Sequence, residues 1–352
     1  MRLLMLTRKV DNLDSRASFV SDWLLALAKN LDHLTVICQE KGDLTGLPDN
    51  IDIHSLGKEL GHSKIRQFFR AQKLLFQLVK NCDGVFAHQM PIYGILAGPW
   101  RRLFHKKLVQ WYAHGAVDWR LKLSNFFVTE FVTSSADGFR MKTKKPVAII
   151  GQGININKFK GQRAKGKSKD GYNIISIGRI SPSKDYESMI KAIYELQEQG
   201  MDNLKLIIIG APAMAEGFAY SQNLQTMVES MNLKQQVEFI GGLPQAEIIP
   251  RLVEADLFLN LSDTGSLDKT VLEAMATGCL VLTSNIAYKN ILPGELFTAK
   301  DNPELLAERI KKIINLAPER KEELSQRLRQ EVVENHNLEN FARKIVQLFS
   351  GK

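Results

Sequence analysis

Residues 255–285 constrain the fold more than any other part of this chain. Two apolar runs of strand length, Leu257–Leu261 and Cys279–Thr283, flank a predicted helix at Lys269–Thr277. A strand, a loop, a helix and a second strand in this order indicate two parallel strands joined by a right-handed crossover. The stretch therefore predicts a parallel α/β sheet.

The loop Ser262–Asp268 inside this stretch is the first candidate binding site. Ligands of parallel sheets lie beyond the carboxyl ends of the strands, which is where this loop falls. We predict that the following helix begins at an Asp268 N-cap and ends at Gly278. The N–H groups and positive dipole end of its first turn attract anions, so we interpret the unit as a holder of a nucleotide-linked diphosphate.

At 352 residues the chain is too long for one ordinary core, and two domains are expected. Apolar runs alternate with helical patterns in both halves, which is typical of doubly wound α/β layers. We predict an N-terminal domain at 1–160, joined by a C-terminal helix at 338–352, and a second domain at 161–337, with a linker at 162–171. The strands are expected at 2–7, 34–38, 51–55, 84–87, 107–113, 131–134, 147–150, 173–177, 204–209, 237–240, 257–261 and 279–283.

Composition favours a soluble, cytoplasmic protein. The chain is 44% hydrophobic and 24% charged, and no apolar run approaches the roughly 20 residues of a membrane span. Its three cysteines are widely spaced, which argues against a disulfide framework and against a metal site.

The net charge of +9 is unevenly distributed. Residues 1–160 hold 24 Lys and Arg against 13 Asp and Glu, whereas residues 161–352 hold 23 against 25. We expect the first half to face an anionic partner: lipid, nucleic acid or acidic glycan. The predicted helix Ser63–Lys80 combines basic residues with Phe68 and Phe69, which suggests an anionic membrane surface; a solvated basic helix face is an equally weighted alternative.

Arg179 and Lys184 flank a predicted turn at the carboxyl end of a strand, where both cations can converge on one diphosphate. The alternative is a pair of solvated loop charges. Glu273 lies in an apolar helix, and we read it either as a ribose acceptor or as a solvent-facing partner of Lys269. His114 follows another strand, with a structural role as the alternative.

Two further features are interpreted as structural. His88 also follows a strand, and there we favour a structural role. Residues 151–153, Gly-Gln-Gly, lack the third glycine of a dinucleotide fingerprint and indicate a tight turn near the domain junction.

Three segments together resemble a known family. Gly178-Arg179 with Lys184, Phe-Ile-Gly-Gly-Leu at 239–243 and Leu-Glu-Ala-Met-Ala-Thr-Gly at 272–278 resemble the retaining nucleotide-sugar glycosyltransferases of family four, glycosyl transferases group 1. The similarity covers nearly the whole chain, with 151–159 resembling the family's junction segment and 338–348 its closing helix. It implies the GT-B fold, in which two Rossmann-like doubly wound domains face a central cleft.

The resemblance also implies roles for single residues. Arg179 and Lys184 match the pair that neutralises the donor diphosphate, and His114 matches a histidine near the transferred sugar; these three are the expected catalytic residues. The expected donor-binding residues are Gly178, Gly210, Ala211, Gly242, Leu243, Gly265, Ser266, Leu267, Asp268, Lys269, Thr270 and Glu273, the last as the acid that binds the ribose.

One position departs from the family pattern. Eight residues before the ribose-binding acid the family usually has a glutamate followed by Gly-Phe-Gly, and this chain has Gly265 followed by Ser266, Leu267 and Asp268. Backbone N–H groups of this loop remain able to hold sugar hydroxyls, with Asp268 as a substitute acceptor.

The resulting expectation is a retaining transferase that moves a hexose-like sugar from a nucleotide diphosphate donor to a glycan or lipid-linked acceptor, in polysaccharide or glycolipid synthesis, with neither metal nor cofactor. Association with the inner face of the cell membrane is an open alternative to a freely cytoplasmic protein. A degenerate, non-catalytic nucleotide-sugar-binding protein of the same fold is the main rival, favoured by Gly265. A nucleic-acid binder ranks last, because stacking and recognition motifs are absent from the sequence.

Overall fold

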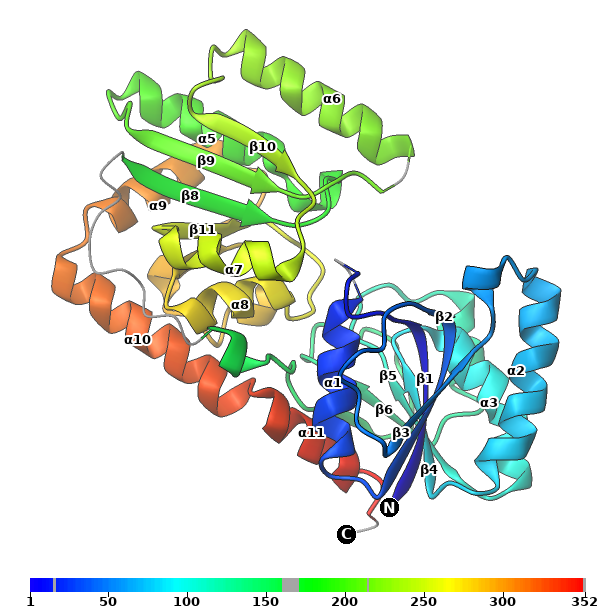
Figure 1. Cartoon of the computed structure of the whole chain (residues 1–352). Helices are drawn as coiled ribbons and strands as arrows, with labels where there is room; N and C mark the ends of the chain where they lie inside the picture. Colours follow the sequence, from blue (N-terminus) through cyan, green and yellow to red (C-terminus); the bar gives the residue numbers. More distant parts are fainter. Residues whose placement is uncertain (15–16, 160–170, 214, 351–352) are drawn as a thin grey trace. The chain divides into compact units, whose positions relative to one another are not determined.

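The computed structural model describes residues 1–14, 17–159, 171–213 and 215–350. The chain divides into two compact units (Figure 1). Unit 1 consists of residues 1–155 and 337–352, and unit 2 of residues 156–336. The predicted linker at 162–171 lies almost entirely outside the described residues, as does the predicted boundary between residues 160 and 161.

Unit 1 is built on a parallel sheet whose strand order, within the described residues, is β3-β2-β1-β4-β5-β6-β7. Its strands are β1 (Arg2–Val10), β2 (His33–Lys41), β3 (Ile51–Ser55), β4 (Gly84–His88), β5 (Lys107–Trp111), β6 (Glu130–Thr133) and β7 (Val147–Ile149). Alternate residues of β1 enter different cores: Leu3 and Met5 join one cluster, and Leu4 and Leu6 join the other. The central strands are therefore buried on both faces, as parallel strands usually are.

Helices cover both faces of this sheet (Figure 1). One face packs against α1 (Ser18–Ala28) and α11 (Leu338–Gln347). The other packs against α2 (Lys64–Val79), α3 (Pro91–Leu103) and α4 (Trp119–Ser124). Ser63 caps α2 by accepting a hydrogen bond from the Arg66 N–H, and Asp118 caps α4 by accepting from the Leu121 N–H.

The C-terminal helix α11 completes the core of unit 1. The Phe341 ring lies 4.4 Å from the Trp23 ring and 5.3 Å from the Trp111 ring, measured between centroids. A β-carbon on Gly153 would lie 2.8 Å from side-chain atoms of both Leu338 and Phe341, so the chain passes too close for a larger residue. No turn is assigned at residues 151–153, where one was predicted, although Gly151 adopts a positive φ of 81°.

Unit 2 carries a second parallel sheet with strand order β10-β9-β8-β11-β12 within the described residues. Its strands are β8 (Tyr172–Ile177), β9 (Leu204–Ile209), β10 (Val237–Gly241), β11 (Leu257–Asn260) and β12 (Leu280–Thr283). Its helices are α5 (Tyr186–Glu198), α6 (Ala215–Ser230), α7 (Gln245–Glu254), α8 (Lys269–Thr277), α9 (Pro303–Ile314) and α10 (Pro318–Asn335). Helix α5 packs on α6 and α9, while α8 packs on α7 and α10.

The predicted fold class, α/β with two Rossmann-like domains, is confirmed. Every predicted strand occurs, although β1 and β2 extend further, to Val10 and Lys41. Helix α4 begins at Trp119, because the Asp118 side chain caps its first turn. Short 3₁₀ turns lie at Lys58–Leu60, Ile156–Phe159, Pro182–Lys184, Ile286–Tyr288 and Gly294–Leu296.

Phe341→Ala should destabilise unit 1 by about 3–5 kcal/mol, because a buried aromatic side chain is lost between two tryptophans. All four tryptophans of the chain lie in unit 1, at positions 23, 100, 111 and 119, so tryptophan fluorescence during urea unfolding reports on that unit alone. Phe69→Ala removes an exposed ring from the same unit and should leave the midpoint nearly unchanged. Equal midpoints for the two variants would contradict this account of α11.

Candidate functional site

Glycines draw together the loops that follow β8, β9 and β10. The Gly178 N–H donates to the Ile209 carbonyl at 3.0 Å, and the Gly210 N–H donates to the Gly241 carbonyl at 2.8 Å. A β-carbon on Gly210 would lie 1.8 Å from the Gly178 carbonyl oxygen, so only glycine fits there. Ala211 continues the contact by accepting a hydrogen bond from the Ile180 N–H at 3.3 Å. The loops therefore form one continuous floor at the carboxyl edge of the sheet.

Lys184 reaches across this floor to the start of α8. Its side chain runs past Gly178, where a β-carbon would lie 3.4 Å from the Lys184 Cε. Its Nζ donates to the Asp268 Oδ2 at 3.0 Å, and both side chains are 17% exposed. The Asn260 Nδ2 donates to the same oxygen at 3.0 Å. The predicted approach of Lys184 to the 265–268 loop is thus present in the structure.

Asp268 is the N-cap residue of α8, as predicted, but its side chain does not cap the helix. The carboxylate makes no capping hydrogen bond, because it is engaged by Lys184 and Asn260. The backbone carbonyl of Asp268 instead accepts from the Tyr288 hydroxyl at 2.7 Å and from the Val271 N–H at 3.2 Å. Consequently the positive end of α8 is not neutralised by the residue that usually does so.

Other contacts fix the loop that leads into α8. Gly265 is buried with a φ of +71°, a left-handed conformation that a glutamate would adopt only with strain. The Asn285 Nδ2 donates to the Ser266 carbonyl at 2.8 Å, and the Leu267 side chain is buried. Lys269 and Thr270, in the first turn of α8, are half-buried. The turn that follows β12 therefore fixes the backbone of this loop through Asn285.

Glu273 is buried, with 7% of its surface exposed, so the solvent-facing alternative is wrong. Its Oε1 accepts from the Gln245 Nε2 at 2.7 Å, which connects α8 to the start of α7. The Tyr288 hydroxyl lies near this carboxylate; burial raises the pKa of Tyr288 first, and the charges of Asp268 and Glu273 raise it further. The buried acid has the polar partner that burial requires.

The remaining donor-binding candidates lie around the same edge. Arg179 is exposed, and its guanidinium forms no hydrogen bond or ion pair with a residue that the structure describes. Gly242 is exposed and Leu243 is half-buried, just after β10. The structure therefore brings Lys184, Asp268 and the first turn of α8 together, while Arg179 is left turned to solvent.

The two candidate histidines belong to unit 1. His114 follows β5, is exposed, and accepts through Nδ1 from the Ala116 N–H at 3.0 Å. His88 is fully buried, its Nδ1 lies 2.9 Å from the Thr7 hydroxyl, and its ring packs at a tilt against Trp23, so its structural interpretation is confirmed.

Sequence reasoning missed the polar residues that support the site. Asn260 ends an apolar strand and is 3% exposed; its Oδ1 accepts from the Thr283 hydroxyl at 3.0 Å. Gln245 and Tyr288 were also missed, because their partners lie far away in the sequence. Only Asn260 carried a local signal: a polar side chain at the carboxyl end of a buried strand.

Among the described residues, no group of three or more His, Cys, Asp or Glu side chains is arranged to hold a metal ion. No described helix is both long and apolar enough to cross a membrane.

Two Rossmann-like domains of this kind make up the GT-B fold of glycosyltransferases. The family described as "Glycosyl transferases group 1" matches residues 157–331, nearly the whole of unit 2. The chain belongs to this family. No curated protein matches the chain.

Solved structures of low sequence identity share the fold. HepE from Anabaena, in complex with UDP and glucose, has a TM-score of 0.77 and 16% identity over 100% of both chains. A glycosyltransferase from Rickettsia africae has a TM-score of 0.75 and 16% identity, over 99% of this chain and 97% of that one. Sucrose-phosphate synthase from Thermosynechococcus elongatus has a TM-score of 0.75 and 16% identity, over 99% and 98%.

Gly210→Ala should destabilise unit 2, because the new methyl group would collide with the Gly178 carbonyl and push two loops apart. We expect a cost of about 1–3 kcal/mol, measured as a lower melting temperature by calorimetry. Gly242→Ala is the matched control: its β-carbon would meet only the Ala211 Cβ, at 3.6 Å. If Gly242→Ala destabilises as much as Gly210→Ala, the close approach of the loops is not what requires glycine.

Proposed function

We propose that this glycosyltransferase moves a hexose-like sugar from a nucleotide diphosphate donor to a glycan or lipid-linked acceptor, with retention of configuration and without a metal ion. The observation that carries the proposal is the Lys184 amino group at the uncapped first turn of α8. Similarity to HepE, whose structure contains UDP and glucose, supports a nucleotide-sugar donor.

Three positive elements suit a diphosphate at this edge. Lys184 supplies a half-buried ammonium, and Arg179, which lies five residues earlier in the same loop after β8, supplies an exposed guanidinium. The first turn of α8 adds N–H donors and the positive end of its dipole. A preorganised cation beside the departing diphosphate lowers the barrier, because negative charge grows there as the bond to the sugar breaks. These groups supply the charge that a metal would otherwise provide.

Glu273 and the residues after β9 and β10 are the proposed nucleoside contacts. Glu273 is held by Gln245 in a fixed orientation, and a carboxylate of this kind accepts hydrogen bonds from ribose hydroxyls. Gly210, Ala211 and Gly242 form a floor without bulky side chains, and with Leu243 beside them they offer a surface against which a base can lie. His114 of unit 1 is proposed to act near the transferred sugar, on the family resemblance alone.

On the acceptor side, we propose that unit 1 meets an anionic membrane surface through α2. Ile65, Phe68 and Phe69 are exposed on this helix beside Lys64, Arg66 and Arg70. Flotation with anionic vesicles at low and high salt tests this idea, since screening weakens such attraction.

Incubation with uridine, guanosine and adenosine diphosphate sugars, with and without a chelator, tests the main proposal. We expect nucleotide release with one donor, undiminished by chelator, and a loss of about 10²–10³ in kcat/KM for Lys184→Ala. Lys191→Ala, an exposed lysine on α5, is the control. Saturable nucleotide binding without transfer to any acceptor would instead support the non-catalytic alternative, and no binding to any member would end the proposal.

Asp268→Asn should bind nucleoside diphosphate more tightly than the natural chain. The bound diphosphate must share Lys184 with a carboxylate 3.0 Å away, and the amide keeps the shape while removing the negative charge. We expect the dissociation constant of the nucleoside diphosphate to fall about tenfold. The change is smaller than the unscreened Coulomb energy of the Lys184–Asp268 pair would give, because that pair is partly solvated. Calorimetric titration measures it. Weaker binding to Asp268→Asn would show that Asp268 contacts the donor directly.

A further inference from the structure

A basic hollow lies in unit 1 away from the residues discussed so far. It has a volume of about 470 Å³ and is lined by Asn125, Lys142, Thr143, Lys144 and Lys145. Asn125 lies shortly before β6, and the lysines lie directly before β7. Because all strands of this sheet are parallel, the hollow is at the amino edge. His114 follows β5, at the opposite, carboxyl edge, about 17 Å away for strands of five residues.

The cations around the hollow are not neutralised. Arg101 and Arg102, at the end of α3, add their charges to those of the three lysines. None of these five side chains forms an ion pair with any described residue. Burial lowers the pKa of Lys145, and the positive charges of Arg101 and Arg102 lower it further, so these groups share one local field.

Hydrogen bonds hold the hollow open in a defined shape. The Arg101 Nε donates to the Phe127 carbonyl at 3.0 Å, and the Arg102 Nη2 donates to the Phe126 carbonyl at 2.6 Å. The Thr143 hydroxyl donates to the Asn125 Oδ1 at 2.8 Å, and the Lys145 Nζ donates to the Val128 carbonyl. The charged donors that remain, on Lys142 and Lys144, suit an acceptor-only anion such as a phosphate.

Two exposed apolar side chains follow residues of this basic region in the sequence. Phe126, which is 67% exposed, follows Asn125 of the hollow, and Leu103, which is 58% exposed, follows Arg102. A free phosphate in water gains nothing from exposed apolar side chains, whereas a lipid headgroup brings acyl chains that can pack on them. These side chains therefore favour a membrane lipid over a soluble anion.

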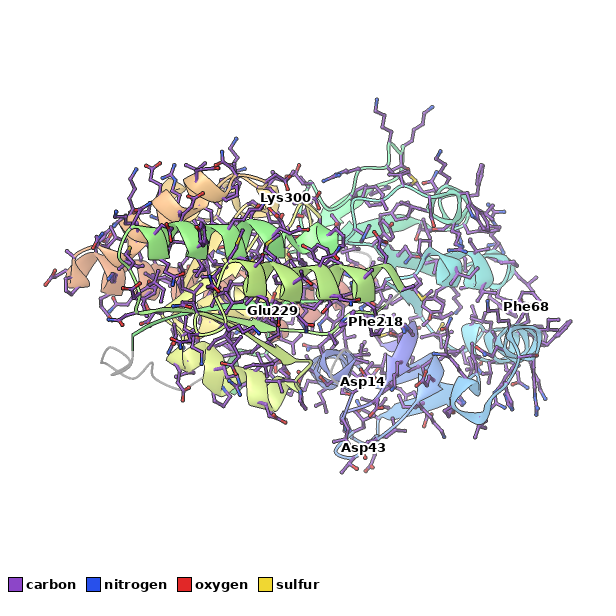
Figure 2. The ribbon with its side chains drawn as sticks, turned by 90° about the horizontal axis from the view of Figure 1, so that it is seen from above. Asp14, Asp43, Phe68, Phe218, Glu229 and Lys300 are labelled. Atoms are coloured by element: carbon purple, nitrogen blue, oxygen red, sulfur yellow. The ribbon has the colours of Figure 1, made fainter. Side chains whose placement is uncertain are left out.

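The apolar surface continues onto α2. Phe76 of α2 packs on Trp100 and Phe104 of α3, at 5.3 and 6.0 Å between ring centroids. Farther along α2, Phe68 points outward from the helix (Figure 2) and lies beside Phe69. Helix α2 has basic residues and not one acidic residue.

We propose that the hollow binds the phosphate group of an anionic membrane lipid, with Lys142 and Lys144 on the phosphate and Phe126 and Leu103 at the acyl boundary. This site is separate from the donor site and does not depend on the proposed transfer reaction. Helix α2 spans about 24 Å along the flank of the sheet between its carboxyl and amino edges. A bilayer that contacts this flank does not cover the carboxyl edge of the unit 1 sheet.

The test is flotation of the full chain with phosphatidylcholine vesicles, with and without phosphatidylglycerol. The variant Lys142→Ala/Lys144→Ala removes two exposed lysines that line the hollow. Lys191→Ala/Lys289→Ala removes the same charge from exposed positions of unit 2 and is the matched control. We expect the hollow variant to partition about thirtyfold more weakly and the control within about twofold of the natural chain. Melting temperatures check that each variant is folded.

A second arm separates a lipid from a soluble ligand. Phe126→Ser should weaken vesicle binding several-fold and leave the weak affinity for glycerol phosphate unchanged. Equal losses in the two lysine variants, or no binding of the natural chain to anionic vesicles, would overturn the proposal. Tight binding of glycerol phosphate in the hollow without vesicle binding would overturn the claim that the bound phosphate belongs to a membrane lipid. Nucleoside diphosphate binding, measured in parallel, should be unaffected by every variant, so failure here is distinct from failure of the donor site.

Discussion

The candidate site of unit 2 depends on the direction in which the Asp268 carboxylate points. Asp268 stands at the start of α8, where an aspartate ordinarily turns back to satisfy the helix amides. Here Lys184 and Asn260 hold it to the side, so the ammonium is oriented and the helix end keeps its positive potential. Asn260 in turn accepts a hydrogen bond from the hydroxyl of Thr283, a buried residue of β12. The hydrogen bonds from Thr283 through Asn260 and Asp268 to Lys184 thus fix the position of the ammonium relative to the sheet.

The elements that the sequence predicted well are those with local causes. The bounds of α8 follow from its apolar pattern and from Gly278, whose positive φ of 80° terminates the helix. The orientation of Asp268 could not be predicted, because local propensity favours the cap and a lysine 84 residues earlier in the sequence overrides it. Glu273 shows the same limit: the sequence indicated that a buried acid needs a partner, and only the fold identifies it as Gln245.

The two units use positive charge in different ways. In unit 2, Lys184 is half-buried and paired with a carboxylate, so its charge is local and directed. In unit 1, the cluster around Lys145 is unpaired among the described residues, and its field extends into solvent over about a Debye length. The first arrangement suits recognition of one diphosphate, and the second suits attraction to a large anionic surface.

The departure from the family pattern at Gly265 bears on whether the site is degenerate. A site that has lost its function is free to accumulate unsatisfied or uncompensated polar groups, since nothing maintains their arrangement. Here the left-handed conformation at Gly265 disfavours the usual side chain, but a carboxylate is present three positions later, at Asp268, where its Oδ2 accepts from both Lys184 and Asn260. A carboxylate with defined partners therefore remains in this loop, although it lies three positions later than in the family pattern. This relocation favours a working transferase with altered sugar contacts over a protein that only retains the nucleotide pocket.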